Sequence, residues 1–370
     1  MLPKKAEHIP ENMTLTEKNR YFARAAVGKL ELTDFPGLSS ELEATNCMHS
    51  QSVNVSTVKV RMYFIMFRIS HARMGAVGLR GLDLTTYPWD VDRMEPDVDA
   101  ACAMIREVEP TLALVGQSVF LFPTPLQEMA DAAHEVGAMV MYDGAHVLGL
   151  IGGGQFQDPL REGADVVTGS SHKTFPGPQG GFILSDSEDA KFHRKLNSAI
   201  FPGVCSSYHL HHVAGKVIAL AEFAEYGATY AEAIIDNAKA FGAAMAAEGF
   251  DVLAEGRGYT ASHQILTRHG ATDSGAGAKA AEMLEDAGII TNMNMLPGDT
   301  KAMTPSGLRL GVQELTRVGM GVDQMQDVAR IYARILLQGE DPAAVKLDVQ
   351  ALKAEHQTVQ YCFDPGPAYP

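Results

Sequence analysis

The order of apolar and polar positions divides the chain into parts of different character. Residues 1–44 are polar, include a helix-like stretch around residues 16–27 and break at the Pro-Gly pair of residues 36–37. From about residue 45 to residue 225, short runs that are apolar throughout alternate with longer helical stretches. This alternation is typical of a parallel or mixed sheet covered by helices on both faces. The strands predicted here are residues 111–115, 138–142, 164–168 and 181–184, with a helix beginning near residue 123.

The remaining sequence predicts longer helices and a smaller mixed unit. Two long helices are expected at residues 213–230 and 230–248, before a segment in which short strands and helices alternate. In that segment we expect strands at residues 265–267, 288–292 and 307–311, and helices at residues 277–287 and 322–337. The predicted organisation is an N-terminal arm at 1–44, a large domain at 45–225, a small α+β domain at 226–340, and a C-terminal helix and tail at 341–370.

Composition narrows the class of protein. The 370 residues are 46% hydrophobic and 20% charged, which is typical of a soluble globular protein. A net charge of −15 argues against nucleic acid as a partner, because such a surface repels phosphate. No apolar run is long enough to span a membrane, and residues 1–7 do not form the apolar core of a secretory signal. Four widely spaced cysteines favour a reducing compartment, so we expect a cytoplasmic enzyme.

A lysine in residues 165–184 carries the clearest chemical signal. An apolar strand runs into a group of hydroxyl residues, then His172 and Lys173, followed by a Gly/Pro turn and another apolar strand. A solvated charge is unusual at such a place. An amine becomes a useful nucleophile when desolvation lowers its pKa, and it can then form a Schiff base with an aldehyde.

A carboxylate lies thirty residues upstream, in the block Asp143-Gly-Ala-His146. An acid at the carboxyl end of a buried strand lies where open α/β sheets bind ligands. A lysine and a carboxylate on neighbouring strand ends suit pyridoxal phosphate, because the lysine holds the aldehyde and the carboxylate keeps the pyridine nitrogen protonated. The alternative is a capping Asp143 and a surface Lys173 without catalytic roles.

These two blocks resemble the serine hydroxymethyltransferase family, whose hallmark is a Thr/Ser-rich run, His-Lys-Thr and a Gly-Pro-Arg-Gly-Gly turn. The resemblance covers roughly residues 45–340. It implies an α/β fold-type I enzyme dependent on pyridoxal phosphate: a large domain with a mostly parallel sheet of the seven-stranded type, and a smaller C-terminal α+β domain. Lys173 would be the Schiff-base lysine and Asp143 the partner of the pyridine nitrogen. His146, His172 and Ser170 would lie beside the cofactor.

Other blocks extend the resemblance to the phosphate and the substrate. Residues 48–52 resemble the family loop that binds the cofactor phosphate, which implies phosphate contacts for Ser50, Gln51 and Ser52. Ser118 matches the family serine near the phenolic oxygen of the cofactor. Arg309 matches the arginine that binds the substrate carboxylate, a task suited to its planar fork. An Arg309 that is merely salt-bridged on a strand is the structural alternative.

The family pattern also breaks in places. Residues 291–297 resemble a segment in which an asparagine, here Asn294, lies near the folate, yet the block Tyr-Ala-Glu-Gly-Tyr-Pro that serves folate binding and proton transfer is absent. Gln179 replaces the arginine after Gly-Pro, and residues 201–207 lack the family's Gln-Gly-Gly. In the shortened region 58–71, Arg68 stands where a ring-stacking histidine belongs, which makes His71 the second, catalytic histidine.

The resemblance therefore implies interconversion of serine and glycine, with tetrahydrofolate as the one-carbon acceptor, in a homodimer or a dimer of dimers. The alternatives are a folate-independent threonine-type aldolase or transaldolase acting on β-hydroxy-α-amino acids, and a non-catalytic homologue. The run His209-Leu-His211-His212 is not expected to bind metal, because successive residues of a helix point in different directions.

Overall fold

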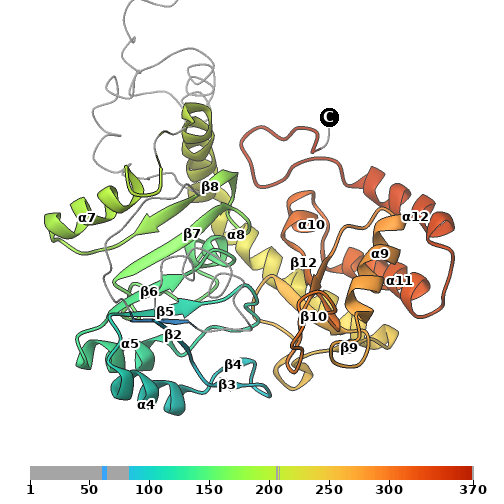
Figure 1. The fold of residues 1–370 in the computed structure, drawn as a ribbon. Helices are drawn as coiled ribbons and strands as arrows, with labels where there is room; N and C mark the ends of the chain where they lie inside the picture. The colour runs from blue at the N-terminus through green and yellow to red at the C-terminus, as the bar shows by residue number, and fades with distance from the viewer. Residues whose placement is uncertain (1–60, 65–82, 206, 208, 369–370) are drawn as a thin grey trace, which may run out of the picture.

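The computed structural model describes residues 61–64, 83–205, 207 and 209–368 (Figure 1). The predicted N-terminal arm lies outside the described residues. So do the predicted phosphate-binding residues Ser50, Gln51 and Ser52, and the predicted catalytic His71.

A mostly parallel six-stranded sheet forms the first part of the described chain. Its strand order is β2-β1-β5-β6-β7-β8, in which the first five strands run parallel and β8 runs antiparallel to β7. The apolar runs become central strands because both faces of the sheet are covered. The strands are β1 (Arg61–Phe64), β2 (Asp83–Thr86), β5 (Leu112–Gly116), β6 (Met139–Asp143), β7 (Val166–His172) and β8 (Pro176–Leu184).

Short helices and a two-stranded ladder accompany this sheet. The helices are α4 (Val98–Val108), α5 (Leu126–Glu135), α6 (Leu148–Gly152) and α7 (Ala190–Ile200), and the ladder pairs β3 (Trp89–Asp90) with β4 (Glu95–Pro96). The sequence pattern did not predict α4, although a capping signal is present. The Asp97 carboxylate accepts a hydrogen bond from the Ala100 N–H (3.1 Å), which satisfies a free donor of the first turn.

An antiparallel four-stranded sheet forms the second part. Its order is β11-β12-β10-β9, with Arg309 of β12 opposite Asn292 of β11 and Leu266 of β10. Helices α9 and α11 lie beside it in Figure 1. The elements are β9 (Asp251–Val252), η2 (Glu255–Arg257), β10 (Gln264–Arg268), α9 (Ala276–Asp286), β11 (Asn292–Asn294), β12 (Gly307–Gly311), α10 (Gln313–Arg317), α11 (Val322–Leu336) and α12 (Pro342–Glu355).

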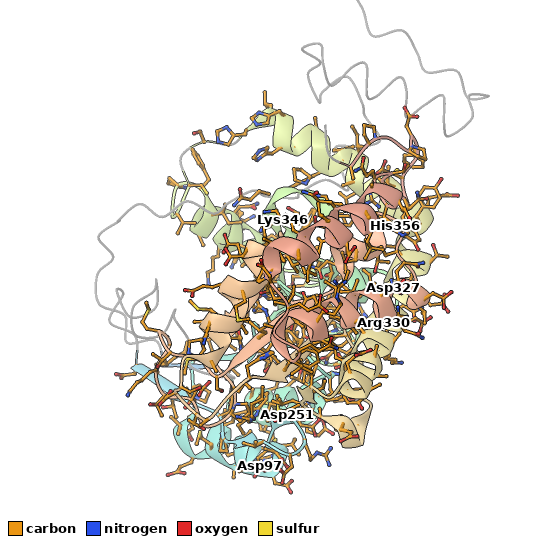
Figure 2. The ribbon with its side chains drawn as sticks, turned by 90° about the vertical axis from the view of Figure 1, so that its right-hand side faces the viewer. Asp97, Asp251, Asp327, Arg330, Lys346 and His356 are labelled. Carbon is orange, nitrogen blue, oxygen red and sulfur yellow. The ribbon has the colours of Figure 1, made fainter. Side chains whose placement is uncertain are left out.

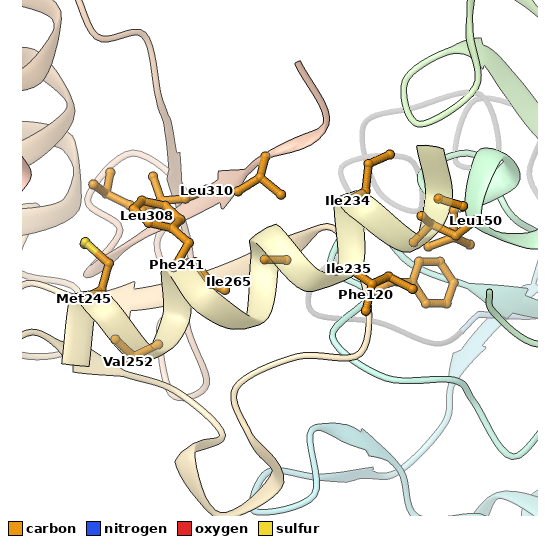
Figure 3. Packing of buried hydrophobic residues seen from close by; sticks show 14 of the residues in the cluster. Phe120, Leu150, Ile234, Ile235, Phe241, Met245, Val252, Ile265, Leu308 and Leu310 are labelled. Atoms are coloured by element: carbon orange, nitrogen blue, oxygen red, sulfur yellow. The ribbon is translucent and has the colours of Figure 1, made fainter. Parts of the chain in front are cut away.

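A single helix, α8 (Leu210–Glu248), joins the two sheets and corrects the prediction of two helices. Its 39 residues continue through Tyr230 because no proline interrupts the helix there. Figure 3 shows Ile234 and Ile235 near Phe120 and Leu150 of the first part. Further along α8, the buried side chains face the second sheet; they are Phe241 and Met245, seen near Val252, Ile265, Leu308 and Leu310. The predicted domain boundary after residue 225 falls within this helix.

Two predicted strands have different bounds. The Gly/Pro segment expected to be a turn belongs to β8, which begins at Pro176. Prolines are tolerated there because β8 is at the edge of the sheet. The strand predicted at residues 288–292 is β11 at Asn292–Asn294 instead. The prediction was based on the apolar pair Ile289-Ile290, but Ile290 is 89% exposed and this pair follows the left-handed turn at Gly288.

Charged side chains lie on the outer faces of the C-terminal helices. Figure 2 shows Asp327 and Arg330 on α11 and Lys346 on α12 at the surface. Arg330 and Asp327 form an exposed ion pair of 2.8 Å, a kind of contact that contributes about 1 kcal/mol or less. Among the described helices, none combines the length and apolar character needed to cross a membrane.

Candidate active site

Lys173 and Asp143 stand at the same edge of the first sheet. Asp143 is the last residue of β6, and Lys173 directly follows β7, the neighbouring parallel strand. The carboxyl ends of parallel strands form the edge at which open α/β sheets bind ligands. The sequence prediction that these two residues lie on neighbouring strand ends is thus confirmed by the sheet register.

The surroundings of Lys173 favour its neutral, nucleophilic amine. Burial lowers the pKa of Lys173, the negative charge of Asp143 opposes this shift, and the positive charge of Arg309 adds to it. A lysine at the end of a β-strand is otherwise a solvated cation with a high pKa. Lys173 thus differs from an ordinary surface lysine in its partial burial and in the direction of its pKa shift.

Two histidine rings stack beside this pair of residues. The rings of His146 and His263 are 5.8 Å apart between centroids and inclined by 18°. Burial, together with the charges of Lys173 and Arg309, lowers the pKa of His146 to about 2. Burial and the same two charges lower the pKa of His263 to about 3. Both rings are therefore neutral at physiological pH.

A loop carbonyl links the two sheets at this site. The carbonyl oxygen of Ser118, just after β5, accepts a hydrogen bond from Nη1 of Arg309 on β12 (2.8 Å). The same oxygen accepts one from Nε2 of Gln264 on β10 (3.2 Å). Burial lowers the pKa of Arg309, although its guanidinium stays charged at any physiological pH. Among the described residues, a backbone carbonyl and no carboxylate binds the Arg309 side chain, which leaves its charge available for an anion.

The segment after Lys173 is tied to the loop that carries His146. The buried Thr174 hydroxyl donates to the carbonyl of His146 (2.8 Å) and accepts from the N–H of Gly149 (3.0 Å). A Cβ on Gly149 would lie 2.3 Å from the carbonyl of Thr174, so only glycine allows this approach. These contacts fix the distance between the lysine segment and the histidine loop.

Gly116 brings β5 close to Asp143, and substituting it gives a first testable prediction. Its φ is +153°, and a Cβ there would lie 2.6 Å from both Cβ and the carbonyl oxygen of Asp143. We expect Gly116→Ala to displace Asp143 and to weaken binding of a ligand at this carboxylate by about tenfold or more. Equilibrium binding of pyridoxal phosphate measures this. Gly154→Ala, at a left-handed position with open space around it, is the control for strain alone; equal affinities in the two variants would contradict the expectation.

The other predicted site residues have varied placements. Ser170 is buried on β7 opposite Gly181. His172 is exposed, and its Nδ1 lies 3.2 Å from the carbonyl of Gly180. The Ser118 side chain is in an exposed position, and the carbonyl of this residue makes the contacts described above. Asn294 lies on the same face of the second sheet as Arg309, and its amide donates to the carbonyl of Met295 (2.6 Å).

Four residues at this site were not predicted from the sequence: His263, Gln264, Thr174 and Gln117. A weak signal existed, since His263 and Gln264 are polar residues directly before the apolar pair Ile265-Leu266 of β10. The described residues leave Nδ1 of His263 and both amide atoms of Gln117 buried without a hydrogen-bond partner. Buried polar atoms without partners are uncommon and favour a ligand that supplies them.

The arrangement fits the aldehyde and ring portions of pyridoxal phosphate. Lys173 offers an amine with a lowered pKa. Asp143 uses one carboxylate oxygen to accept the Ala145 N–H (3.0 Å), and among the described residues its other oxygen has no hydrogen-bond partner. The neutral His146 and the unpaired atoms of His263 and Gln117 complete a polar lining. The predicted phosphate-binding residues lie outside the described part, so this fit concerns the ring alone.

The neutral buried histidines predict how stability depends on pH. His146, His263 and His269 have pKa values of about 2, 3 and 4 because burial disfavours their charged forms. The unfolded chain protonates them near pH 6.5, so it binds more protons than the folded protein as pH falls. We expect the free energy of unfolding to fall by about 1 kcal/mol for each histidine between pH 7 and pH 5.5, as measured by urea unfolding. His269→Asn should flatten this slope and the exposed His211→Gln should not; equal stability at both pH values would contradict the prediction.

The rings of His209, His211 and His212 lie close together at the start of α8, with centroids 4.5–5.6 Å apart. In the described ranges, no group of three or more His, Cys, Asp or Glu side chains is placed to hold a metal ion.

Comparison with known proteins identifies relatives of this chain. A family model for serine hydroxymethyltransferase matches residues 69–332. The serine hydroxymethyltransferase of Thermococcus kodakarensis is 55% identical over 304 residues, which cover 80% of this chain and 70% of the relative. The enzyme of that name from Pyrococcus furiosus is 54% identical over 301 residues, with the same coverage. A crystal structure of L-threonine transaldolase from Pseudomonas fluorescens matches with a TM-score of 0.78 and 25% identity, over 98% of this chain and 82% of that one. The predicted fold class, an α/β fold-type I enzyme, is confirmed.

Proposed function

This chain belongs to the serine hydroxymethyltransferase family, and on that premise we propose that it interconverts serine and glycine as a one-carbon transferase dependent on pyridoxal phosphate. The observation that carries the proposal is the meeting of Lys173, Asp143 and Arg309 around one strand edge. These residues would supply an amine, a carboxylate and a cation that can bind a carboxylate, which supports the proposal. An amino acid is the substrate class that needs all three.

Each of these residues has one task in the proposed reaction. Lys173 would hold pyridoxal phosphate through Nζ, a task that requires the neutral amine that burial favours. Asp143 would keep a proton on the pyridine nitrogen. Arg309 binds the substrate carboxylate and so orients the Cα–Cβ bond. When bound, pyridoxal phosphate withdraws electrons from the bond that breaks at Cα.

The neutral histidines adjust this site without adding charge. His146 donates or accepts a hydrogen bond beside the cofactor ring without adding a cation next to Lys173, because its pKa is about 2. A cationic histidine there would disfavour a protonated substrate amine at the site, because the two positive charges repel each other. His146 and His263 therefore supply polarity while leaving Asp143 as the group that sets the charge of the ring.

Tetrahydrofolate is proposed as the acceptor of the hydroxymethyl carbon, with Asn294 as a contact. Asn294 lies on the face of the second sheet that carries Arg309, which supports this assignment. The described residues offer no replacement for the absent Tyr-Ala-Glu-Gly-Tyr-Pro block. This absence, together with the similarity in fold to an L-threonine transaldolase, favours one second candidate: a folate-independent aldolase or transaldolase acting on β-hydroxy-α-amino acids.

One assay separates the two candidates. Glycine formation from serine is measured with the purified holoenzyme, with and without tetrahydrofolate, beside acetaldehyde release from threonine. We expect serine cleavage to depend on tetrahydrofolate. Cleavage of threonine that is faster than that of serine and indifferent to folate would overturn the first candidate in favour of the second. Asn294→Ala should raise the KM for tetrahydrofolate without changing the rate on threonine; an unchanged KM would exclude the Asn294 contact.

Family membership also supports a proposal about the organisation of the protein. We propose a cytoplasmic homodimer or dimer of dimers, with the domain division predicted from the sequence and without nucleic acid or membrane as partner. The net charge of −15 supports the last point. Sedimentation equilibrium tests the assembly, and a monomer at micromolar concentration would contradict it.

A further inference from the structure

The side chain of Gln264 is a buried junction between the two sheets. It stands at the start of β10 and is 2% exposed. Its Oε1 accepts a hydrogen bond from the N–H of Phe120 (2.9 Å). Its Nε2 reaches the carbonyl of Ser118 (3.2 Å) and Nδ1 of His146 (3.1 Å). One amide group thus contacts the loop after β5 at two places and the histidine after β6.

The partners of this amide determine its orientation. The Phe120 N–H can only donate, so the atom facing it must be the oxygen of the amide. The Ser118 carbonyl can only accept, so the atom facing it must be the nitrogen. Nε2 has two protons, and with one directed to Ser118 the other is directed to Nδ1 of His146. The orientation of the amide is therefore fixed by two backbone groups, of which one can only donate and the other can only accept a hydrogen bond.

This orientation decides which nitrogen of His146 carries the proton. A nitrogen that accepts a hydrogen bond has no proton of its own, so Nδ1 is bare and the neutral ring is protonated at Nε2. Within the described part of the chain, Nε2 has no hydrogen-bond partner. The charged and titratable groups around the ring are Lys173, Arg309, His263 and His172, and each of them disfavours a second proton on His146.

We propose that Gln264 is a positioning residue that holds the ring of His146 as the tautomer protonated at Nε2 and aligns it with Arg309 through the shared carbonyl of Ser118. The inference deepens the proposed function and rests on it, because His146 and Arg309 are there the neighbours of the cofactor and of the substrate carboxylate. Gln264, which contacts the ring at Nδ1, thus keeps the proton of His146 on Nε2, where it can serve as a hydrogen-bond donor. Because Gln264 stands on β10, a shift of this strand would displace both His146 and the Ser118 carbonyl that binds Arg309.

The tautomer can be observed without turnover. Long-range ¹H–¹⁵N correlation spectra of the full-length holoenzyme with ¹⁵N-labelled histidine show which ring nitrogen is protonated, and comparison with His146→Asn identifies the signal. We expect Nε2 protonated and Nδ1 bare at neutral pH. A ring of His146 that is protonated at Nδ1, alone or with Nε2, would overturn the proposal with no Gln264 variant needed.

Gln264→Glu reverses the hydrogen bond while keeping the shape of the side chain. A carboxylate cannot donate to Nδ1 but can accept from it, so we expect the proton of His146 to appear on Nδ1 in this variant. We expect kcat on serine to fall about tenfold or more with a smaller change in KM. Gln324→Glu is the matched control, because the Oε1 of Gln324 accepts the Gly321 N–H (2.9 Å) on α11, away from the site; the His146 signal and kcat should stay as in the wild type.

The outcomes separate this proposal from the function on which it rests. A wild-type tautomer at Nε2 that persists in Gln264→Glu would mean that another group sets it, and the proposal fails. If Gln264→Glu does not fold, the isosteric Gln264→Met replaces it, and loss of the single Nε2–H form is expected there; its retention overturns the proposal. A failed serine assay beside the predicted tautomers would reject the reaction but not the role of Gln264 in orienting His146.

Discussion

Replacing Lys173 with alanine is expected to abolish the cleavage of serine, with a loss of at least about 10³-fold in kcat. Lys173 directly follows β7, where burial lowers the pKa of its amine and so favours the nucleophilic form. Alanine removes that amine and leaves the hydrogen bonds of the neighbouring Thr174 unchanged. The rate of glycine formation and the absorbance of bound cofactor measure the two effects separately.

The matched control for this prediction is Lys195→Ala on the exposed face of α7. It removes the same side chain away from the strand edge and should retain the wild-type rate. A Lys173→Ala protein that folds and keeps more than about a hundredth of the wild-type rate would show that another amine does this work.

Asp143→Asn should lower kcat on serine by about two orders of magnitude or more. The amide has the shape of the carboxylate and can still accept the Ala145 N–H, so the loop should keep its geometry. It cannot hold a proton on a pyridine nitrogen by charge. Because the negative charge of Asp143 raises the pKa of Lys173, the substitution should also lower that pKa further.

The matched control here is Asp189→Asn, since Asp189 likewise accepts a backbone N–H two residues ahead, from Lys191 (2.8 Å), at the exposed start of α7. Its effect should be limited to a small loss of stability. A rate in Asp143→Asn equal to that of Asp189→Asn would reduce Asp143 to a capping residue, which was the structural alternative from the sequence.

The pattern of apolar positions predicted the strands that carry the site and missed features that depend on distant contacts. The apolar residues of the segments 138–142 and 164–168 predicted β6 and the first part of β7, whereas β7 continues through hydroxyl residues to His172. The bounds of β11 could not, because the apolar residue Ile290 is exposed and the polar Asn292 pairs with Arg309. At β11, pairing between strands outweighed the local hydrophobic pattern in setting the bounds of the strand.

The chemistry of the site was predicted as residue types and not as a network. Lys173 and Asp143 were found because amines and carboxylates have few structural reasons to stand at the ends of buried strands, whereas Arg309 was found through the resemblance of its segment to a family motif. Gln264 was not, since its contact with His146 joins residues 118 positions apart. A single sequence contains no signal for such a contact, and an amide at the start of a strand is an ordinary residue until its partners are known.

The most direct test of the account is borohydride reduction of the purified protein, followed by mass spectrometry of its peptides. We expect an absorbance band of lysine-bound pyridoxal phosphate in the folded protein, and a reduced pyridoxyl group on Lys173 after treatment. Folded protein without such a band after incubation with pyridoxal phosphate, or a pyridoxyl group on a lysine other than Lys173, would contradict the account.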